Sequence, residues 1–439
     1  MPQTTLHRRT LLLILAAYLV LATGYAVVTP PWQAPDEPAH FNYIRHLWET
    51  RSLPELRAGD YPADLLEELK RRKWPPDLSV DTLRYESHQP PLFYLIAAPV
   101  YGLAQTLHLG LRGTVVALRL VSVVLGVGLL LLAYRITRRV LPESPSLALA
   151  ATTFVAFLPM HLAVTAAINN DTLAELALAG LLLLSLTRLE GRIPQRRWTI
   201  LGALLVAVAL LTKTTIYLSA LALPAAAELG AWWRRGRFGL APAISVLLNV
   251  YVGALVVAGA WFLRNQAVYG AGDYFGWGRH DSIVVGQLTT REWLAQVGLG
   301  RGLRQAASTL FQSFWGVFGW LGAPFQNEVY WVLYAVTALA VLGLALYAWG
   351  HRGWPRPAFW LLGLVIGLAL AGLVGYNLKF VQHQARYVFP ALVPLALLFC
   401  LGLREVWARE HERVMLTLTS LALAGLAVYG LLVVIRRQL

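Results

Sequence analysis

Residues 31–41 read Pro-Trp-Gln-Ala-Pro-Asp-Glu-Pro-Ala-His-Phe, and they follow directly on a strongly apolar segment at residues 11–28. A proline fits the first turn of a helix, where its missing N–H group would have had no partner. Pro38 therefore predicts that a helix begins here, with Asp36 or Glu37 near its N-terminal cap. The apolar residues that follow fall on one helical stripe, namely Phe41, Ile44, Leu47 and Trp48. The stretch predicts an interfacial helix that presents two adjacent carboxylates at a membrane surface.

Two interpretations of this acid pair are open at this point. Asp36 can be the N-cap residue of a surface helix, or it can be a carboxylate that takes part in catalysis. His40 follows Asp36 by four residues, which places both side chains on one face of the predicted helix. The choice between the two interpretations depends on the rest of the chain.

The composition is that of a polytopic membrane protein. Of the 439 residues, 57% are hydrophobic and only 14% are charged, and the mean hydropathy is +0.56. The net charge of +14 comes mostly from short basic clusters between apolar segments, a pattern of membrane topology rather than of nucleic-acid binding. A single cysteine, Cys400, excludes a disulfide framework and a cysteine metal cluster. Residues 11–28 lack a cleavage site, so we interpret them as an uncleaved first span.

The basic clusters set the predicted topology. The N-terminus carries His7, Arg8 and Arg9, which predicts a cytoplasmic location, and the clusters within 135–139 and 188–197 fall in inner loops. We expect an all-α protein with one integral membrane domain over residues 1–439, in the plasma (inner) membrane. It has about eleven transmembrane helices, at residues 11–28, 115–134, 147–168, 173–186, 200–211, 216–233, 241–262, 330–349, 358–376, 388–403 and 414–435.

Two long polar segments, 29–112 and 264–328, then lie outside the membrane and carry interfacial helices. Within the first segment, residues 92–109 are apolar but are interrupted by Pro99 and Gly102. We interpret them as an interfacial or re-entrant helix, because a further span would turn every later basic cluster outward. Arg436 and Arg437 still fall outside, against the positive-inside rule.

This topology gathers many ionisable residues on the outer face. They are Asp36, Glu37, His40, His88, Asp171, Lys213, Arg264, Arg279, His280, Asp281, Glu328, Lys379, His383 and Arg386. Carboxylates beside cations suit a site that activates a hydroxyl or amine while it holds a phosphate. Other roles are open for single residues. Asp171 can cap the helix that begins at Thr172, Lys213 can extend to the interface, and Arg386 can be an anchor in an aromatic belt.

Several kinds of chemistry have no motif in the sequence. The chain has no glycine-rich nucleotide loop with a lysine, no His-Glu-x-x-His helix and no Gly-x-Ser-x-Gly turn. It also has no internal duplication of the kind found in secondary transporters. These absences count against ATP-coupled transport, membrane metalloproteolysis and, more weakly, secondary transport.

The ordered motifs resemble the GT-C membrane glycosyltransferases, such as the protein O-mannosyltransferases and the bacterial aminoarabinose transferase. Most similar is a bacterial family of uncharacterised GT-C-like membrane proteins. Beyond the Asp-Glu pair, the resemblance is carried by His88-Gln89-Pro90-Pro91-Leu92-Phe93-Tyr94, Leu118-Arg119-Leu120, Asn170-Asp171, Leu211-Thr212-Lys213, Trp261-Phe262-Leu263-Arg264-Asn265, Tyr269-Gly270, the segment 313–320 and Gln384-Ala385-Arg386-Tyr387-Val388-Phe389-Pro390.

The resemblance implies a GT-C-like helical bundle that moves a sugar from a polyprenyl-phosphate donor to an envelope acceptor (a glycan, lipid or protein) on the extracytoplasmic face. It implies Asp36 as the general base, with Glu37 in support or as the alternative base. Asp171, together with His40, then forms an acceptor or second acidic site. Lys213, Arg386 and Arg264 are the candidates to bind the donor phosphate. The expected partners are a polyprenyl-phosphate-linked sugar and membrane lipid, and no nucleic acid.

Three questions stay open at this stage. Metal use differs among these relatives, so the resemblance neither requires nor excludes a divalent metal. The sugar and the acceptor are not identified. Two other functions also fit the membrane topology, a flippase or transporter for lipid-linked sugars and an inactive scaffold in envelope assembly.

Overall fold

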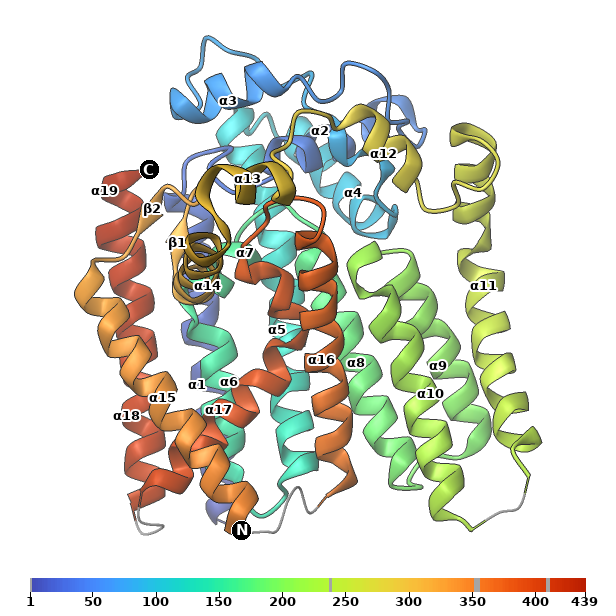
Figure 1. The fold of residues 1–439 in the computed structure, drawn as a ribbon, viewed down its shortest axis with the longest axis vertical. Coiled ribbons are helices and arrows are strands. Elements are labelled where there is room, and N and C mark those ends of the chain that lie inside the picture. Colours follow the sequence, from blue (N-terminus) through green and yellow to red (C-terminus); the bar gives the residue numbers. More distant parts are fainter. Residues whose placement is uncertain (1, 237–238, 351–355, 408–410) are drawn as a thin grey trace.

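The protein is a bundle of helices with a helical cap over one end (Figure 1). The computed structural model describes residues 2–236, 239–350, 356–407 and 411–439. Its elements are α1 (Pro2–Val28), α2 (Glu37–Thr50), α3 (Ala63–Arg71), η1 (Tyr85–His88), α4 (Leu92–Thr106), α5 (Gly110–Val140), α6 (Pro145–Phe157), α7 (Pro159–Thr165), α8 (Asp171–Leu189), α9 (Gln195–Leu210), η2 (Thr214–Ile216), α10 (Tyr217–Arg234), α11 (Ala241–Tyr269), α12 (Trp277–Ile283), α13 (Thr290–Val297), α14 (Leu299–Trp315), β1 (Val317–Phe318), β2 (Ala323–Pro324), α15 (Asn327–Gly350), α16 (Pro357–Asn377), η3 (Ala385–Ala391), α17 (Leu392–Val406), α18 (Glu412–Tyr429), η5 (Gly430–Ile435) and α19 (Arg436–Gln438).

The expected all-α membrane fold is confirmed, although the number of spans is not. Among the described residues, eight helices are long and apolar enough to cross a membrane, and nine if the bent pair α6 and α7 counts as one span. The predicted eleven also included residues 200–211 and 216–233. These lie in α9 and α10, which stand beside α8 in Figure 1. α10 carries Glu228, whose carboxylate is buried against Arg188 of α8 with N–O distances of 2.6 and 2.7 Å.

The predicted span at residues 147–168 is broken rather than continuous. α6 ends at Phe157, α7 begins at Pro159, and the two helices are bent by 62°. The cause is Pro159, because a proline lacks the N–H group and disfavours a helical conformation in the residue before it. The bend brings the segment after α7 back under the cap, where Asn169 and Asn170 lead into α8.

The cap gathers the two long polar segments at one end of the bundle. In Figure 1, α2, α3, α4, α12 and α13 lie together above the long helices, and the described N-terminal end lies at the opposite end of the bundle from the C-terminus. At about 1.5 Å per residue, the 15-residue α4 is about 22 Å long and falls short of a hydrocarbon core of about 30 Å. Its length supports an interfacial position, which remains a prediction.

A close helix crossing fixes α17, the helix that follows η3. Gly402 of α17 lies against the backbone of α15, and a Cβ atom added there would come within 2.0 Å of the Ala340 carbonyl oxygen. A Cβ atom on Gly343 would come within 1.8 Å of the Gly402 carbonyl oxygen. Small residues allow such contact between transmembrane helices. The crossing therefore holds α17 firmly beneath the cap.

Candidate active site

Asp36 occupies the N-cap position of α2 without capping it. Its φ of 65° lies in the left-handed region, which is uncommon for a residue other than glycine. The Asp36 carbonyl oxygen accepts hydrogen bonds from the backbone of Ala39 and His40, but the carboxylate makes no capping bond. The side chain instead points away from its own helix, so the simple capping interpretation does not account for it.

Both oxygens of the Asp36 carboxylate hold donors from distant parts of the chain. Arg386 of η3 approaches Oδ2 with a nitrogen–oxygen distance of 2.5 Å, and the Tyr85 hydroxyl of η1 donates to Oδ1 at 3.0 Å. Burial alone would raise the pKa of Asp36, but the Arg386 guanidinium outweighs burial and lowers that pKa to about 2. Asp36 is therefore a carboxylate anion at neutral pH.

Glu37, the next residue, is held in an entirely different environment. Its side chain is fully buried and accepts two hydrogen bonds of 2.7 Å from the guanidinium of Arg119 in α5. The backbone N–H groups of Trp32 and Ile168 donate to the same carboxylate at 2.9 and 3.2 Å. Arg119 also donates to three carbonyl oxygens at and just beyond the end of α1. Glu37 and Arg119 together lock the cap onto α1 and α5.

Asp171 and Lys213 form a second ion pair under the cap. The Lys213 ammonium lies 2.6 Å from Asp171 Oδ1, and both side chains are largely buried. Asn169 Oδ1 accepts the Asp171 backbone N–H at 3.0 Å, and Asn170 donates to the Thr212 carbonyl at 2.9 Å. The motifs Asn170-Asp171 and Leu211-Thr212-Lys213 thus tie the turn before α8 to the segment after α9.

An open cavity of about 420 Å³ lies beside this region, and Asp36 and Arg386 are in its wall. Its walls come from the first loop, from α3, η1 and α12, and from the segment before η3. The wall is rich in aromatic and amide side chains, namely Tyr61, Tyr85, Trp320, Tyr376, Tyr387, Gln287, Gln382 and Gln384. Such a wall can bind a polar molecule of moderate size beside the Asp36 carboxylate.

His40 and Glu86 complete the charged environment of Asp36. His40 is buried, and its Nδ1 lies 2.8 Å from the Tyr94 hydroxyl. Burial lowers the pKa of His40, and the nearby carboxylates of Glu86, Asp36 and Asp171 oppose that shift only in part. Glu86 lines the cavity without a salt bridge to any described residue. Asp36 is therefore surrounded by the carboxylates of Glu86 and Asp171, by His40, and by the cations Arg386 and Lys213.

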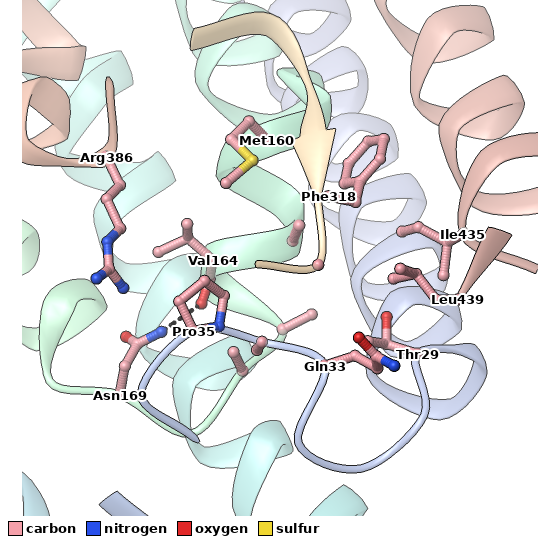
Figure 2. A pocket seen from close by; sticks show the side chains of 15 residues that line it. Thr29, Gln33, Pro35, Met160, Val164, Asn169, Phe318, Arg386, Ile435 and Leu439 are labelled. Carbon is pink, nitrogen blue, oxygen red and sulfur yellow. Dashed lines mark hydrogen bonds between the residues drawn. The ribbon is translucent and has the colours of Figure 1, made fainter. Parts of the chain in front are cut away.

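Arg386 lines both this cavity and a second pocket, which is much smaller and more apolar. Figure 2 shows Arg386 on one side of the second pocket and the apolar residues Met160, Phe318, Ile435 and Leu439 on others, while Asn169, Gln33 and Thr29 supply polar groups. The Ala385 N–H donates to the Ser313 side chain of α14 at 3.0 Å, which fixes the backbone that carries Arg386. The guanidinium is thus placed where a polar cavity meets an apolar one.

Comparison with known proteins gives the fold. The family described as dolichyl-phosphate-mannose-protein mannosyltransferase matches residues 89–261. The oligosaccharyltransferase of Archaeoglobus fulgidus, solved with zinc and sulfate, is 14% identical with a TM-score of 0.51, and the match covers 97% of this chain and 52% of that one. The chain has the GT-C fold. The resemblance to the GT-C membrane glycosyltransferases is therefore confirmed.

Two further solved GT-C structures match the chain. The oligosaccharyltransferase AglB from Archaeoglobus fulgidus, in complex with an inhibitory peptide and a dolichol-phosphate, is 11% identical with a TM-score of 0.50, over 99% of this chain and 56% of that one. ArnT from Cupriavidus metallidurans, bound to undecaprenyl phosphate, is 17% identical with a TM-score of 0.47, over 88% and 59%. The chain thus spans just over half the length of these proteins. No curated protein sequence matches it.

In this GT-C chain, most of the predicted site residues come together. Asp36, Asp171, Lys213 and Arg386 are joined by two ion pairs, and the Arg386 guanidinium also interacts electrostatically with Asp171. Arg264 differs, because it is not among the described residues that line either pocket at Arg386. It donates to the Pro54 carbonyl at 2.6 Å and contacts the ring of Tyr269. Arg264 fastens α11 to the first loop.

Three residues that bind or surround the acid pair were not among the predicted site residues. Arg119 appeared only within a resemblance motif, although an arginine inside an apolar helix signals a buried partner. Tyr85 and Glu86 precede the His88-Gln89-Pro90-Pro91 motif in a polar segment whose sequence has no periodic signal. Their place beside Asp36 depends on the fold of the whole cap.

The described residues do not form a metal centre from side chains alone. They contain no group of three or more His, Cys, Asp and Glu side chains placed to hold a metal ion. Asp36 and Asp171 are each paired with a cation of the protein.

Proposed function

We propose that this protein is a glycosyltransferase that moves a sugar from a polyprenyl-phosphate donor to an acceptor on the extracytoplasmic face, with Asp36 as the general base. The observation that carries the proposal is the Asp36 carboxylate, which lies in the wall of the polar cavity and contacts an arginine that also borders an apolar pocket. A base and a phosphate-binding cation side by side are what transfer from a lipid phosphate needs.

The chemical step uses few groups. The acceptor oxygen or nitrogen attacks the anomeric carbon of the sugar and gives its proton to Asp36. The bond between that carbon and the phosphate oxygen breaks, and the electron pair stays with the phosphate. Arg386 stabilises the charge that develops on the leaving phosphate. Because the donor is already activated by its phosphate, this mechanism needs no nucleotide.

The two pockets at Arg386 suggest where each substrate binds. The polar cavity suits the acceptor and the sugar, because its wall offers amides, hydroxyls and aromatic rings. The apolar side chains around the small pocket of Figure 2, among them Met160, Val164 and Phe318, suit contact with the isoprene unit next to the donor phosphate. In this arrangement the donor phosphate lies at the Arg386 guanidinium.

Asp36 is the better candidate for the base, and Glu37 has another task. Both Glu37 oxygens are held by Arg119 and by backbone N–H groups, and its side chain is fully buried. Lys213 is the second candidate for phosphate binding, although its ammonium is paired with Asp171. Asp171 and His40 stay candidates for contact with the acceptor.

The proposal is tested by reconstitution. The protein in liposomes receives synthetic polyprenyl-phosphate sugars that carry a labelled sugar, together with a cell-envelope fraction as acceptor. We expect label to move to the acceptor while polyprenyl phosphate is released in equal amount. Intact donor that crosses the vesicle membrane without release of polyprenyl phosphate would instead indicate a flippase. Neither transfer nor movement with any donor would favour a scaffold.

A further inference from the structure

The Arg386 guanidinium is already engaged by the protein itself. One of its terminal nitrogens holds Asp36 Oδ2 at 2.5 Å, and the side chain is 12% exposed. Its Nε is buried and has no hydrogen-bond partner among the described residues. The guanidinium also lies over the ring of Tyr387, with 5.3 Å between Cζ and the ring centroid. Arg386 is thus a cation with one anion in place and further N–H groups to offer.

This ion pair makes Asp36 a poor base. A general base works best when the pKa of its conjugate acid lies near the operating pH. Burial would raise the pKa of Asp36, but Arg386 holds it at about 2, several units below neutrality. The Tyr85 hydroxyl, bound to Oδ1, occupies the other oxygen of the carboxylate. A proton acceptor in this state has little driving force to deprotonate a hydroxyl.

We infer that the Asp36–Arg386 ion pair is a latch, which the phosphate of the lipid donor opens. The inference rests on the proposed function. A phosphate at Arg386 competes with Asp36 for the guanidinium and places a negative charge beside the carboxylate. Both effects raise the affinity of Asp36 for a proton. The base thus becomes effective only when the donor is bound, and the order of events is donor first and acceptor deprotonation second.

Because the coupling between two sites is reciprocal, the latch can be measured as phosphate affinity alone, without the acceptor or the sugar. If the phosphate weakens the hold of Arg386 on Asp36, then Asp36 must weaken the binding of the phosphate by the same factor. Removal of the Asp36 charge therefore strengthens phosphate binding even though it removes the base. A residue with a purely catalytic role would leave phosphate binding unchanged.

The experiment measures binding of farnesyl methyl phosphate, a short isoprenyl phosphodiester with one negative charge, to the purified full-length protein by calorimetry. We expect Asp36→Asn to bind the probe about a hundredfold more tightly than the wild type, toward the upper end of the usual range of coupling between two sites. The control is Glu67→Gln, which removes a carboxylate from the wall of the same cavity. Glu67 pairs with Lys70 at 2.8 Å rather than with Arg386. We expect this control to change the affinity less than twofold.

A second readout uses the wild type. Because a hundredfold coupling corresponds to two pKa units, the probe should raise the pKa of Asp36 from about 2 to about 4. Its binding at about pH 4 should then take up about half a proton, which calorimetry in two buffers of different ionisation enthalpy detects. Asp36→Asn should abolish this uptake.

The outcomes separate the latch from the function. Equal or weaker binding by a folded Asp36→Asn protein, with no proton uptake by the wild type, would overturn the latch and leave the phosphate site intact. Wild-type affinity in Arg386→Ala would overturn the phosphate site itself, and the latch with it.

Discussion

Two adjacent carboxylates have different tasks because of where each stands relative to the start of α2. Asp36 precedes the helix in a left-handed conformation, and its side chain points into the polar cavity. Glu37 is the first helical residue, and its side chain points into the bundle against Arg119 of α5. One step along the backbone thus separates the candidate base from a buried structural ion pair.

Glu37→Gln should destabilise the protein, because it leaves the buried Arg119 guanidinium without its counter-charge. Loss of one partner of a buried pair costs about 3–5 kcal/mol. Asp36→Asn should cost far less, since Asp36 is 21% exposed at the edge of a cavity. Thermal unfolding in one detergent compares the two variants. Equal loss of stability in both would contradict this division of tasks.

The sequence predicted Asp36 as a site residue, but it could not separate Asp36 from Glu37. The Asp-Glu-Pro order fixes where α2 begins, and that is a local property. Which carboxylate pairs with Arg119 depends on the packing of α5 against α1. Arg119 lies about 80 residues after the acid pair in the chain. In the same way, Arg264 had the right charge and the right side of the membrane, but the fold directs it to the Pro54 carbonyl.

At the scale of elements, η3 and its neighbours decide where the Arg386 guanidinium lies. α14 holds the backbone at Ala385 through Ser313, and α17 continues from η3 into the close crossing with α15. The motif at residues 313–320 therefore contains a residue, Ser313, that holds the backbone next to Arg386 in place. The sequence also predicted the bend-prone Pro159 region as part of one span, because apolar composition alone does not report a broken helix.

Ser313→Ala should weaken donor binding without removing the base. The substitution leaves the buried Ala385 N–H without its acceptor, at a cost of about 1–3 kcal/mol, and allows η3 to shift. We expect KM for the donor to rise several-fold with a smaller change in kcat. Ser313→Thr, which keeps the hydroxyl, is the control. A fall in kcat alone would argue against a role in positioning.

A pair of histidines joins α12 to η1 and makes this contact sensitive to pH. The rings of His88 and His280 lie 4.6 Å apart, centroid to centroid. Burial lowers the pKa of His88 to about 4, against 6.5 for a free histidine, so the folded protein resists a proton that the unfolded chain accepts. Burial and the neighbouring His88 also lower the pKa of His280, while Glu86 and Asp281 oppose that shift.

Proton linkage determines how the stability of the folded protein changes with pH. Stability contributed by the neutral His88 is complete above about pH 6.5 and decreases as the pH falls toward 4, by about 2 kcal/mol between pH 7 and pH 5. Thermal unfolding at these two pH values should show the loss in the wild type and a smaller loss in His88→Asn. Identical pH dependence in both proteins would contradict the assignment.

A reaction on the extracytoplasmic face requires one orientation of the whole protein in the membrane. The cap lies at one end of the bundle, with the cavity that Asp36 and Arg386 line, and the described N-terminal end lies at the other (Figure 1). The positive-inside rule predicts that the N-terminal end faces the cytoplasm. Composition and charge clusters were sufficient to predict the fold class. The number of spans was not predictable in this way, because several helices are short or bent.

Cysteine labelling in intact cells tests the orientation. Cys400 is the only cysteine and is buried, so the wild type gives little background. Ala58→Cys, in the first long loop, should react with a membrane-impermeant maleimide, whereas Pro142→Cys, between α5 and α6, should react only after the cells are opened. The reverse pattern would place the cavity on the cytoplasmic side and contradict an extracytoplasmic reaction.

Turnover by the wild type and by Asp36→Asn in the reconstituted transfer assay, measured as release of polyprenyl phosphate per protein, tests whether Asp36 is the general base. We predict a loss on the order of a hundred- to ten-thousand-fold, typical of a removed general base, in a protein that is folded and still binds the lipid phosphate. Turnover near the wild-type rate in a folded Asp36→Asn protein would contradict the assignment of Asp36 as the base.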